Sequence, residues 1–159
     1  MAVNDYHFVS TWILKGNIEE VYDILSDPLH YPDWWLPGYL TAKEIKCGSN
    51  GIGRIVALDL KHAVFYSLHW ELESFEAVRP HHLAALSHGD FEGKGIWTLS
   101  QAKDEVRAVF DWQIKAQKPF LKTFSFFLRP FFIWNHNRVM AAGELGLNRQ
   151  LAISNKLYL

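Results

Sequence analysis

The sequence has little cysteine, little net charge and no long apolar run, and each shortage excludes a class of protein. Its single cysteine, Cys47, cannot form a disulfide within the chain or build a cysteine-rich metal site. The 16 basic and 17 acidic residues are interspersed and leave a formal net charge of −1, so no basic patch predicts a nucleic-acid partner. Lys122, Arg129 and Pro130 interrupt the richest apolar stretch, and no run approaches the roughly 20 residues that span a bilayer.

Signals for secretion, cofactors and metals are missing as well. The first 16 residues, MAVNDYHFVSTWILKG, lack the basic and apolar segments of a signal peptide, which together with the lone cysteine predicts a cytoplasmic protein. The glycine-rich stretch 47–53 lacks the Lys-Ser or Lys-Thr and the following helix of a phosphate-binding loop. The eight histidines are not spaced as metal ligands on a helix or strand. We therefore expect no cofactor and no metal.

Aromatic residues, by contrast, are abundant. Seven tryptophans and eleven phenylalanines raise the aromatic share to 15%, within an apolar share of 49%. Large rings line ligand cavities as readily as they fill cores. A chain of 159 residues is long enough to form one domain, 1–159, with both a core and a pocket.

Patterning predicts an α+β fold with most of its strands in the middle of the chain. Residues 6–14 form a first strand, residues 18–25 a helix capped by Asn17, and residues 29–39 either a second short helix or an ordered loop. Asn50-Gly51 favours a type I′ hairpin turn. Alternating residues between turn signals predict six further strands, at 39–47, 53–61, 64–76, 82–89, 95–101 and 105–117. In two of these strands one face is apolar, and it leaves His69 and Asp111 on the solvated face.

The last helix is predicted to run from a first turn that contains Pro130 to about Leu151. Helical spacing gives it one apolar face, made of Phe132, His136, Val139, Met140, Gly143 and Leu147. Trp134 and Leu145 fall on the opposite, polar face. Either the segment 120–128 folds over these two side chains or a partner chain does, in which case the protein is a homodimer.

This order of elements resembles the helix-grip fold of the START and Bet v 1 superfamily, and within it the polyketide cyclase/dehydrase-like group. The residues that carry the resemblance are Trp12, Val21-Tyr22, Tyr31-Pro32-Asp33-Trp34-Trp35, Gly53-Arg54, Tyr66, Trp70, 89–93, Trp97, Asp111-Trp112, Trp134-Asn135-His136, Val139-Met140, Gly143-Glu144 and Gly146-Leu147. The resemblance implies a seven-stranded curved antiparallel sheet that grips the long C-terminal helix, with two short helices and a hydrophobic cavity. Some members cyclise or dehydrate a ligand and many only carry one.

Several residues have both a functional and a structural interpretation. His136 is either a core histidine with a satisfied hydrogen bond or a cavity residue whose nitrogens reach Tyr66, another polar group or an ordered water. Arg54 either heads an inward row and holds a carboxylate or enolate, or is an exposed strand-end arginine. Trp34 and Trp35 either gate the cavity or plug the sheet. Something packs close to Gly143, either a strand or the ligand.

Two hypotheses of function follow. The first is a carrier or sensor whose partner is a hydrophobic small molecule, bound by Trp12, Trp35, Tyr66, Leu68, Trp70, Trp97, Phe110, Trp112, His136, Met140 and Gly143. The alternative is a polyketide cyclase/dehydrase-type enzyme using the same cavity. In that enzyme Tyr66 and His136 exchange protons with the substrate, and Arg54 steadies developing negative charge. Glu144, at the edge of the apolar face, either reaches into the cavity or pairs with an arginine at the surface, and we favour the surface pair.

Overall fold

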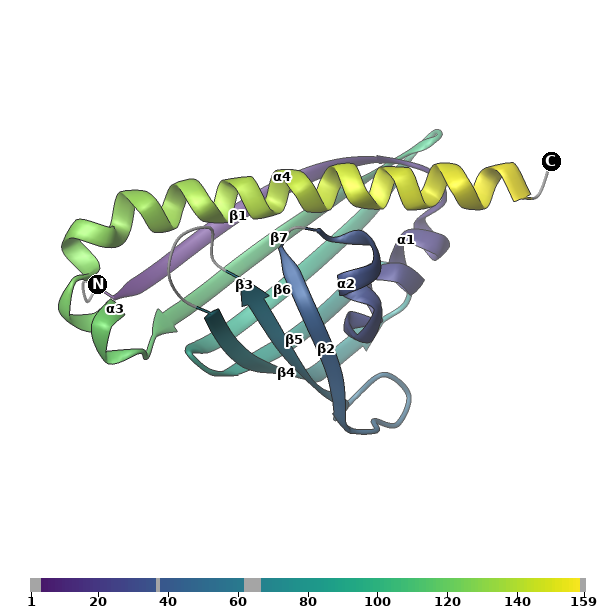
Figure 1. Cartoon of the computed structure of the whole chain (residues 1–159). Helices are drawn as coiled ribbons and strands as arrows, with labels where there is room; N and C mark the ends of the chain where they lie inside the picture. The colour runs from purple at the N-terminus through teal and green to yellow at the C-terminus, as the bar shows by residue number, and fades with distance from the viewer. Residues whose placement is uncertain (1–3, 37, 62–66, 158–159) are drawn as a thin grey trace.

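The computed structural model describes residues 4–36, 38–61 and 67–157, in which one antiparallel sheet packs against one long helix (Figure 1). The strands of this part of the chain are β1 (Asp5–Lys15), β2 (Tyr39–Lys46), β3 (Ile55–Lys61), β4 (Ser67–Val78), β5 (His82–Gly89), β6 (Phe91–Ala102) and β7 (Glu105–Ala116). Their order across the sheet is β1-β7-β6-β5-β4-β3-β2. The predicted seven-stranded antiparallel helix-grip fold is thereby confirmed.

Short helices fill the connection between β1 and β2, and the chain ends in the long one. The helical elements are α1 (Ile18–Leu25), the 3-10 turn η1 (Pro28–His30), α2 (Tyr31–Trp34), α3 (Pro119–Thr123) and α4 (Ser125–Leu157). As predicted, Asn17 caps α1, and its side-chain oxygen accepts a hydrogen bond from the Glu19 N–H at 2.8 Å. Of the two alternatives for residues 29–39, the structure has the short helix.

The turn between β2 and β3 is the predicted type I′ hairpin. Asn50 and Gly51 both have positive φ, 51° and 78°, which this turn requires. Ser49 and Ile52 exchange backbone hydrogen bonds of 2.9 and 3.0 Å across it. Irregular register within the β2–β3 and β4–β5 pairs is the kind of bulge that bends a sheet, and it accompanies the curve of the sheet around α4 (Figure 1).

Two predicted elements, the sixth of the seven strands and the last helix, are clearly longer in the structure than predicted. β6 begins at Phe91, not at residue 95, because only Asp90 separates it from β5, which ends at Gly89. Gly93 lies within the strand, where a side chain would clash with the Gln113 carbonyl of β7. The final helix begins at Ser125 and ends at Leu157, so that Pro130 is inside it and not in its first turn. Pro130 removes one backbone hydrogen bond and brings its ring against the preceding turn, yet the helix continues past it.

The helix α4 lies beside β1, an edge strand, and its side chains satisfy that edge. The Ile13 N–H donates to Glu144 at 2.9 Å and the Lys15 N–H donates to Asn148 at 2.9 Å, while the Asn148 amide donates to the Ile13 carbonyl at 3.1 Å. The expected surface pair of Glu144 with an arginine is therefore wrong. Glu144 and Asn148 instead fix the helix against the strand and cover an otherwise open edge.

The predicted apolar face of α4 is confirmed. Phe132, His136, Met140 and Leu147 are buried, and the helical stripe continues to Leu151, which is fully buried. Among the described residues, no helix has both the length and the apolar character needed to cross a membrane.

Candidate functional site

A cavity of about 620 Å³ lies between the inner face of the sheet and α4. Its lining includes the exposed residues Cys47, Gly48 and Asn50, so it reaches the surface beside the β2–β3 turn. Most of the remaining wall is apolar, and it consists of Leu25, Pro28, Tyr31, Trp35, Tyr39, Leu60, Leu68, Trp70, Leu72, Leu83, Ala84, Ala85, Phe91, Trp97, Phe110, Trp112, Phe132, Val139 and Met140, among others. A volume of this size falls in the range, about 300–1,000 Å³, of small-molecule sites.

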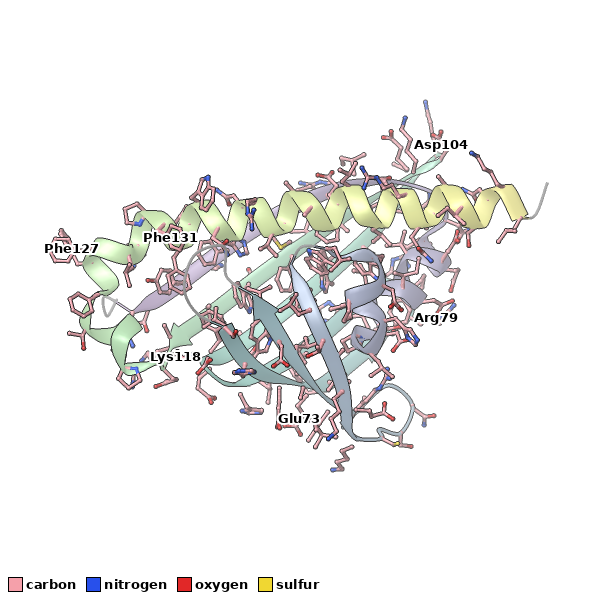
Figure 2. All side chains as sticks on the ribbon, viewed as in Figure 1. Glu73, Arg79, Asp104, Lys118, Phe127 and Phe131 are labelled. Atoms are coloured by element: carbon pink, nitrogen blue, oxygen red, sulfur yellow. The ribbon has the colours of Figure 1, made fainter. Side chains whose placement is uncertain are left out.

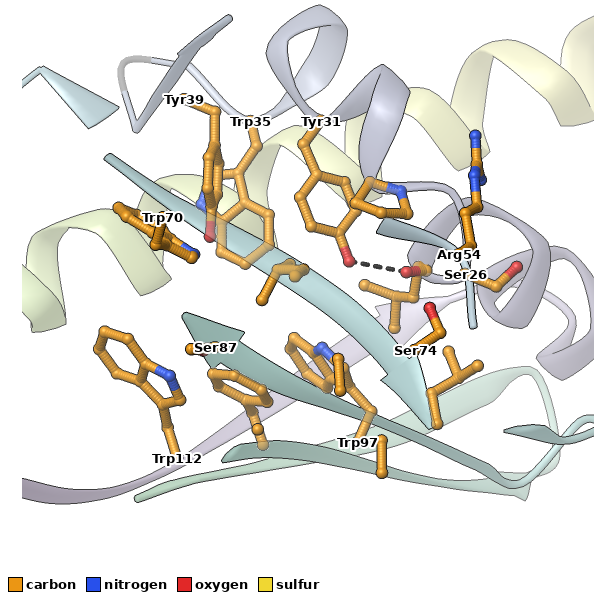
Figure 3. A pocket seen from close by; sticks show the side chains of 18 of the residues that line it. Ser26, Tyr31, Trp35, Tyr39, Arg54, Trp70, Ser74, Ser87, Trp97 and Trp112 are labelled. Atoms are coloured by element: carbon orange, nitrogen blue, oxygen red, sulfur yellow. Dashed lines mark hydrogen bonds between the residues drawn. The ribbon is translucent and has the colours of Figure 1, made fainter. Parts of the chain in front are cut away.

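Aromatic rings form the cavity wall from two sides (Figure 3). Tyr31, Trp35 and Tyr39 descend from the α2 region, with ring centroids 5.0 to 5.4 Å apart. Trp97 and Trp112 rise from β6 and β7 on the opposite side, and Trp70 of β4 lies beside Tyr39 with ring centroids 5.9 Å apart. Edge-to-face and offset contacts of this kind stabilise such clusters by about 0.5–1.5 kcal/mol per pair, so the wall is held in shape without a ligand.

Eight of the predicted ligand-binding residues line the cavity together with Arg54, seven of them apolar or aromatic and the eighth His136. The seven are Trp35, Leu68, Trp70, Trp97, Phe110, Trp112 and Met140. His136 is also on the wall, from the middle of α4. The prediction for Tyr66 lies outside the described residues.

Trp12 and Gly143 are predicted ligand contacts that do not line the cavity. Trp12 is only 2% exposed and packs behind the wall, with ring centroids 5.0 Å from Trp35 and 4.8 Å from Trp97. A Cβ on Gly143 would come within 2.4 Å of the Trp35 ring and 2.7 Å of Trp12. In the structure an indole ring packs against Gly143, and Trp12 and Gly143 lie one layer behind the residues that line the cavity.

From the sequence, Trp34 and Trp35 have the same two interpretations, but the structure places the two side chains differently. Both are buried and their rings stack with centroids 5.2 Å apart. Trp35 faces the cavity, and its indole N–H donates to the Val139 carbonyl of α4 at 2.8 Å. Trp34 is not among the cavity residues; its carbonyl lies where a side chain at Gly146 would be. Trp34 thus belongs to the core, and Trp35 is both core and wall.

His136 combines its two interpretations, because it lines the cavity and also has a protein partner. Its ring stacks against both Phe8 and Trp112, with centroids 4.0 and 5.4 Å away and planes within 20°, and these two rings also contact each other at 6.0 Å. Its Nε2 lies 3.4 Å from the Ser10 hydroxyl of β1, a long hydrogen bond. Burial lowers the pKa of His136 to about 4, so the imidazole is neutral near pH 7.

Arg54 lines the cavity near its outer end, but its charge is already engaged. Its Nε donates to Glu44 at 2.6 Å and its Nη1 donates to Asp27 at 2.9 Å. The side chain is 23% exposed, so of the two interpretations the inward place at one end of the cavity holds, and the carboxylates that Arg54 binds are those of Asp27 and Glu44. Although burial opposes the effect, hydrogen bonds from His30 and Arg54 hold the pKa of the Asp27 carboxyl below its usual value. Arg54 ties β2 to η1 and has no unpaired charge to offer an enolate.

Sequence reasoning missed several polar wall residues, among them Tyr31, Tyr39 and Ser87. Tyr31 donates its hydroxyl to the Leu25 carbonyl at 2.6 Å, and burial raises the pKa of both tyrosines, so they remain protonated. Ser87 is 1% exposed on β5. Tyr31 is one of the residues that carry the family resemblance, but the sequence pattern did not assign it to the cavity. Ser87 lies in a strand whose weak alternation gave no signal.

His69 and Asp111 lie on the solvated face of the sheet, as predicted. His69 pairs with Asp59 and His7 pairs with Asp111, all on the solvated side of the sheet. Within the described ranges, no group of three or more histidine, cysteine or acidic side chains could hold a metal ion.

Trp134 and Leu145 are 52% and 53% exposed on the outer face of α4. The segment 120–128 does not fold over them, because it forms α3 and the first turn of α4 itself. Figure 2 shows Phe127 at the far end of this helix, pointing away from the sheet. Of the two alternatives for Trp134 and Leu145, only the partner chain is left as an expectation.

Comparisons with known proteins agree with this architecture. The family model described as polyketide cyclase/dehydrase and lipid transport matches residues 6–143. A Thermus thermophilus protein, TTHA0849, superposes with a TM-score of 0.77 at 14% identity, over 94% of this chain and 99% of its own. The Zhui aromatase/cyclase from Streptomyces sp. R1128 gives 0.71 at 14% identity, over 93% and 94%. A START superfamily protein from Mycobacterium smegmatis gives 0.70 at 14% identity, over 92% and 97%. No curated protein matches the sequence.

Proposed function

The chain belongs to the polyketide cyclase/dehydrase and lipid transport family, and on that premise we propose that it binds a hydrophobic small molecule in the cavity under α4, as a carrier or sensor. Lipids, polyketide-like compounds and aromatic compounds are the ligand classes that such a wall fits. The observation that carries the proposal is the 620 Å³ cavity lined mainly by rings and aliphatic side chains. Each Å² of apolar ligand surface buried there contributes about 25 cal/mol.

The enzyme remains the second candidate, because the family description includes cyclases and dehydrases and because His136 lies in the cavity wall. The chemistry on the wall supports it less than it supports a carrier. With a pKa of about 4, His136 is a weak base and is not protonated near pH 7. Arg54 is neutralised by Asp27 and Glu44. An acid–base mechanism therefore lacks a group tuned to neutral pH among the residues that the structure places on the wall.

Binding is tested with Nile red, a neutral dye whose fluorescence rises in apolar surroundings, and by thermal unfolding. We expect one saturable site, and at a free dye concentration about 100 times Kd a stabilisation of about 2.7 kcal/mol, or roughly 5–10 °C in Tm for a chain of this length. Ala85→Phe places a ring inside the cavity and is expected to abolish binding. Ala152→Phe, the same change on the exposed side of α4, is the matched control.

Two results would contradict the carrier proposal. One is dye binding that Ala85→Phe leaves unchanged while circular dichroism shows a folded variant, because the site would then lie elsewhere. The other is turnover of a β-hydroxy or poly-carbonyl substrate that is lost in His136→Ala, because that result would establish the enzyme.

A further inference from the structure

Ser87 is a polar group that the fold buries without a protein partner. It lies on β5, is 1% exposed, and its hydroxyl has no hydrogen-bond partner among the described residues. It also lines the cavity. A buried hydroxyl without a partner destabilises a protein by about 1–3 kcal/mol, so its retention at this position needs a reason.

The surroundings of Ser87 explain why only the cavity contents can reach it. It pairs with Leu72 of β4 and Gly93 of β6 in the sheet, and neither has a polar side chain. In Figure 3 it lies between Trp70 and Trp112, close to the wall of rings. The hydroxyl is thus one polar point in an apolar and aromatic surface.

The charged side chains of the cavity lie at the other end and are engaged or exposed. Arg54 pairs with Asp27 and Glu44, and Arg79 pairs with Glu19 and Asp23. Glu76 lines the cavity but is an exposed residue. In Figure 3 Arg54 is at the end away from Trp70 and Trp112.

These charged side chains affect which ligands can enter the cavity. Among the described lining residues, Glu44 and Glu76 match Arg54 and Arg79 in number, and both arginines are already paired with carboxylates, so the rim offers an anion no unpaired arginine. Beside Ser87 a charged group would lose its hydration without gaining a counter-charge, which costs several kcal/mol. A neutral hydroxyl or carbonyl loses far less, and it gains the hydrogen bond that Ser87 lacks.

We propose that Ser87 is the polar recognition point of the cavity and that the ligand is an uncharged ring compound bearing a hydroxyl or carbonyl oxygen. The inference rests on the proposed binding function and adds the class of ligand. The rings of Trp70 and Trp112 stack on the flat part of the ligand, and Ser87 selects its oxygen. Carboxylates such as fatty acids are excluded from entering head first.

Three fluorescent probes with the same ring system test this proposal at neutral pH: pyrene, 1-hydroxypyrene and 1-pyrenecarboxylate. For the unmodified protein we expect 1-hydroxypyrene to bind about tenfold more tightly than pyrene, which corresponds to one satisfied hydrogen bond, and 1-pyrenecarboxylate to bind least. Ser87→Ala is expected to remove the tenfold preference and leave pyrene binding unchanged. Because it deletes an unpaired hydroxyl, it should not lower stability. Ser100→Ala, the same change at an exposed position of β6, is the matched control and keeps the preference.

The outcomes separate the two proposals. If pyrene binds but 1-hydroxypyrene is not preferred, or if Ser87→Ala keeps the preference, the role of Ser87 is refuted and the binding function stands. Tightest binding of the carboxylate refutes the uncharged ligand class. If none of the probes binds the unmodified protein, both proposals fail.

Discussion

Replacing His136 with phenylalanine measures how strongly the buried imidazole couples folding to pH. The pKa of His136 falls from 6.5 to about 4 on folding because burial disfavours the charged ring. As the pH falls, the unfolded chain therefore binds this proton first. The stability that depends on a neutral ring is complete above pH 6.5 and is lost progressively as the pH falls toward 4. At about pH 4.5 the loss in the free energy of unfolding is about 2.5 kcal/mol. This value follows from comparing how strongly the unfolded and the folded chain bind the proton at that pH.

The assay is urea unfolding at about pH 7.5 and about pH 4.5, with the free energy of unfolding extrapolated to water. His136→Phe keeps a ring stacked against Phe8 and Trp112, and we expect its stability to fall about 2.5 kcal/mol less than that of the unmodified protein between these two pH values. Met140→Leu, one turn further along the same buried stripe, changes packing without changing titration and should keep the full pH dependence. Equal pH dependence in His136→Phe and the unmodified protein would refute the reasoning, because the ring would then not be buried in its neutral form.

Three further predictions concern α4. Gly143→Ala should gain about 1 kcal/mol of helix propensity but lose about 3 by overpacking against Trp35, a net destabilisation of about 2 kcal/mol in urea unfolding; a more stable variant would contradict the close packing. Pro130→Ala restores a missing backbone donor and should raise stability by up to about 3 kcal/mol, as measured by thermal unfolding, whereas a lowered Tm would show that Pro130 is needed where it is. If Trp134 and Leu145 form a homodimer contact, light scattering will give twice the chain mass, and Trp134→Ser will give monomers; a monomeric unmodified protein removes this expectation.

Most of the fold could be predicted because its signals are local. Alternation fixed the inward faces of the strands, Asn50-Gly51 fixed a turn whose positive φ values few other pairs adopt, and helical spacing placed His136 on the buried side of α4. The errors at the start of β6 and of α4 come from glycine and proline, which interrupt a pattern in sequence. Gly93 and Pro130 instead sit within regular structure, because the neighbouring strand and the helix register decide their conformation.

The site was harder to predict because it depends on contacts between distant segments. Arg54 shares inward parity with Val56, yet only the fold brings Asp27 and Glu44 to its guanidinium. Ring type alone also cannot separate Trp12, which packs behind the wall, from Trp97, which forms it. That distinction depends on which ring lies nearer the cavity, a property of three-dimensional packing.

A crystal structure of the protein with bound 1-hydroxypyrene is the most direct test of ligand binding in the cavity under α4. We expect the ring system inside the cavity between the sheet and α4, against Trp70 and Trp112, with its oxygen within hydrogen-bond distance of Ser87. This expectation would be contradicted by a ligand bound on the outer surface, for example at Phe127, with side chains filling the space under α4.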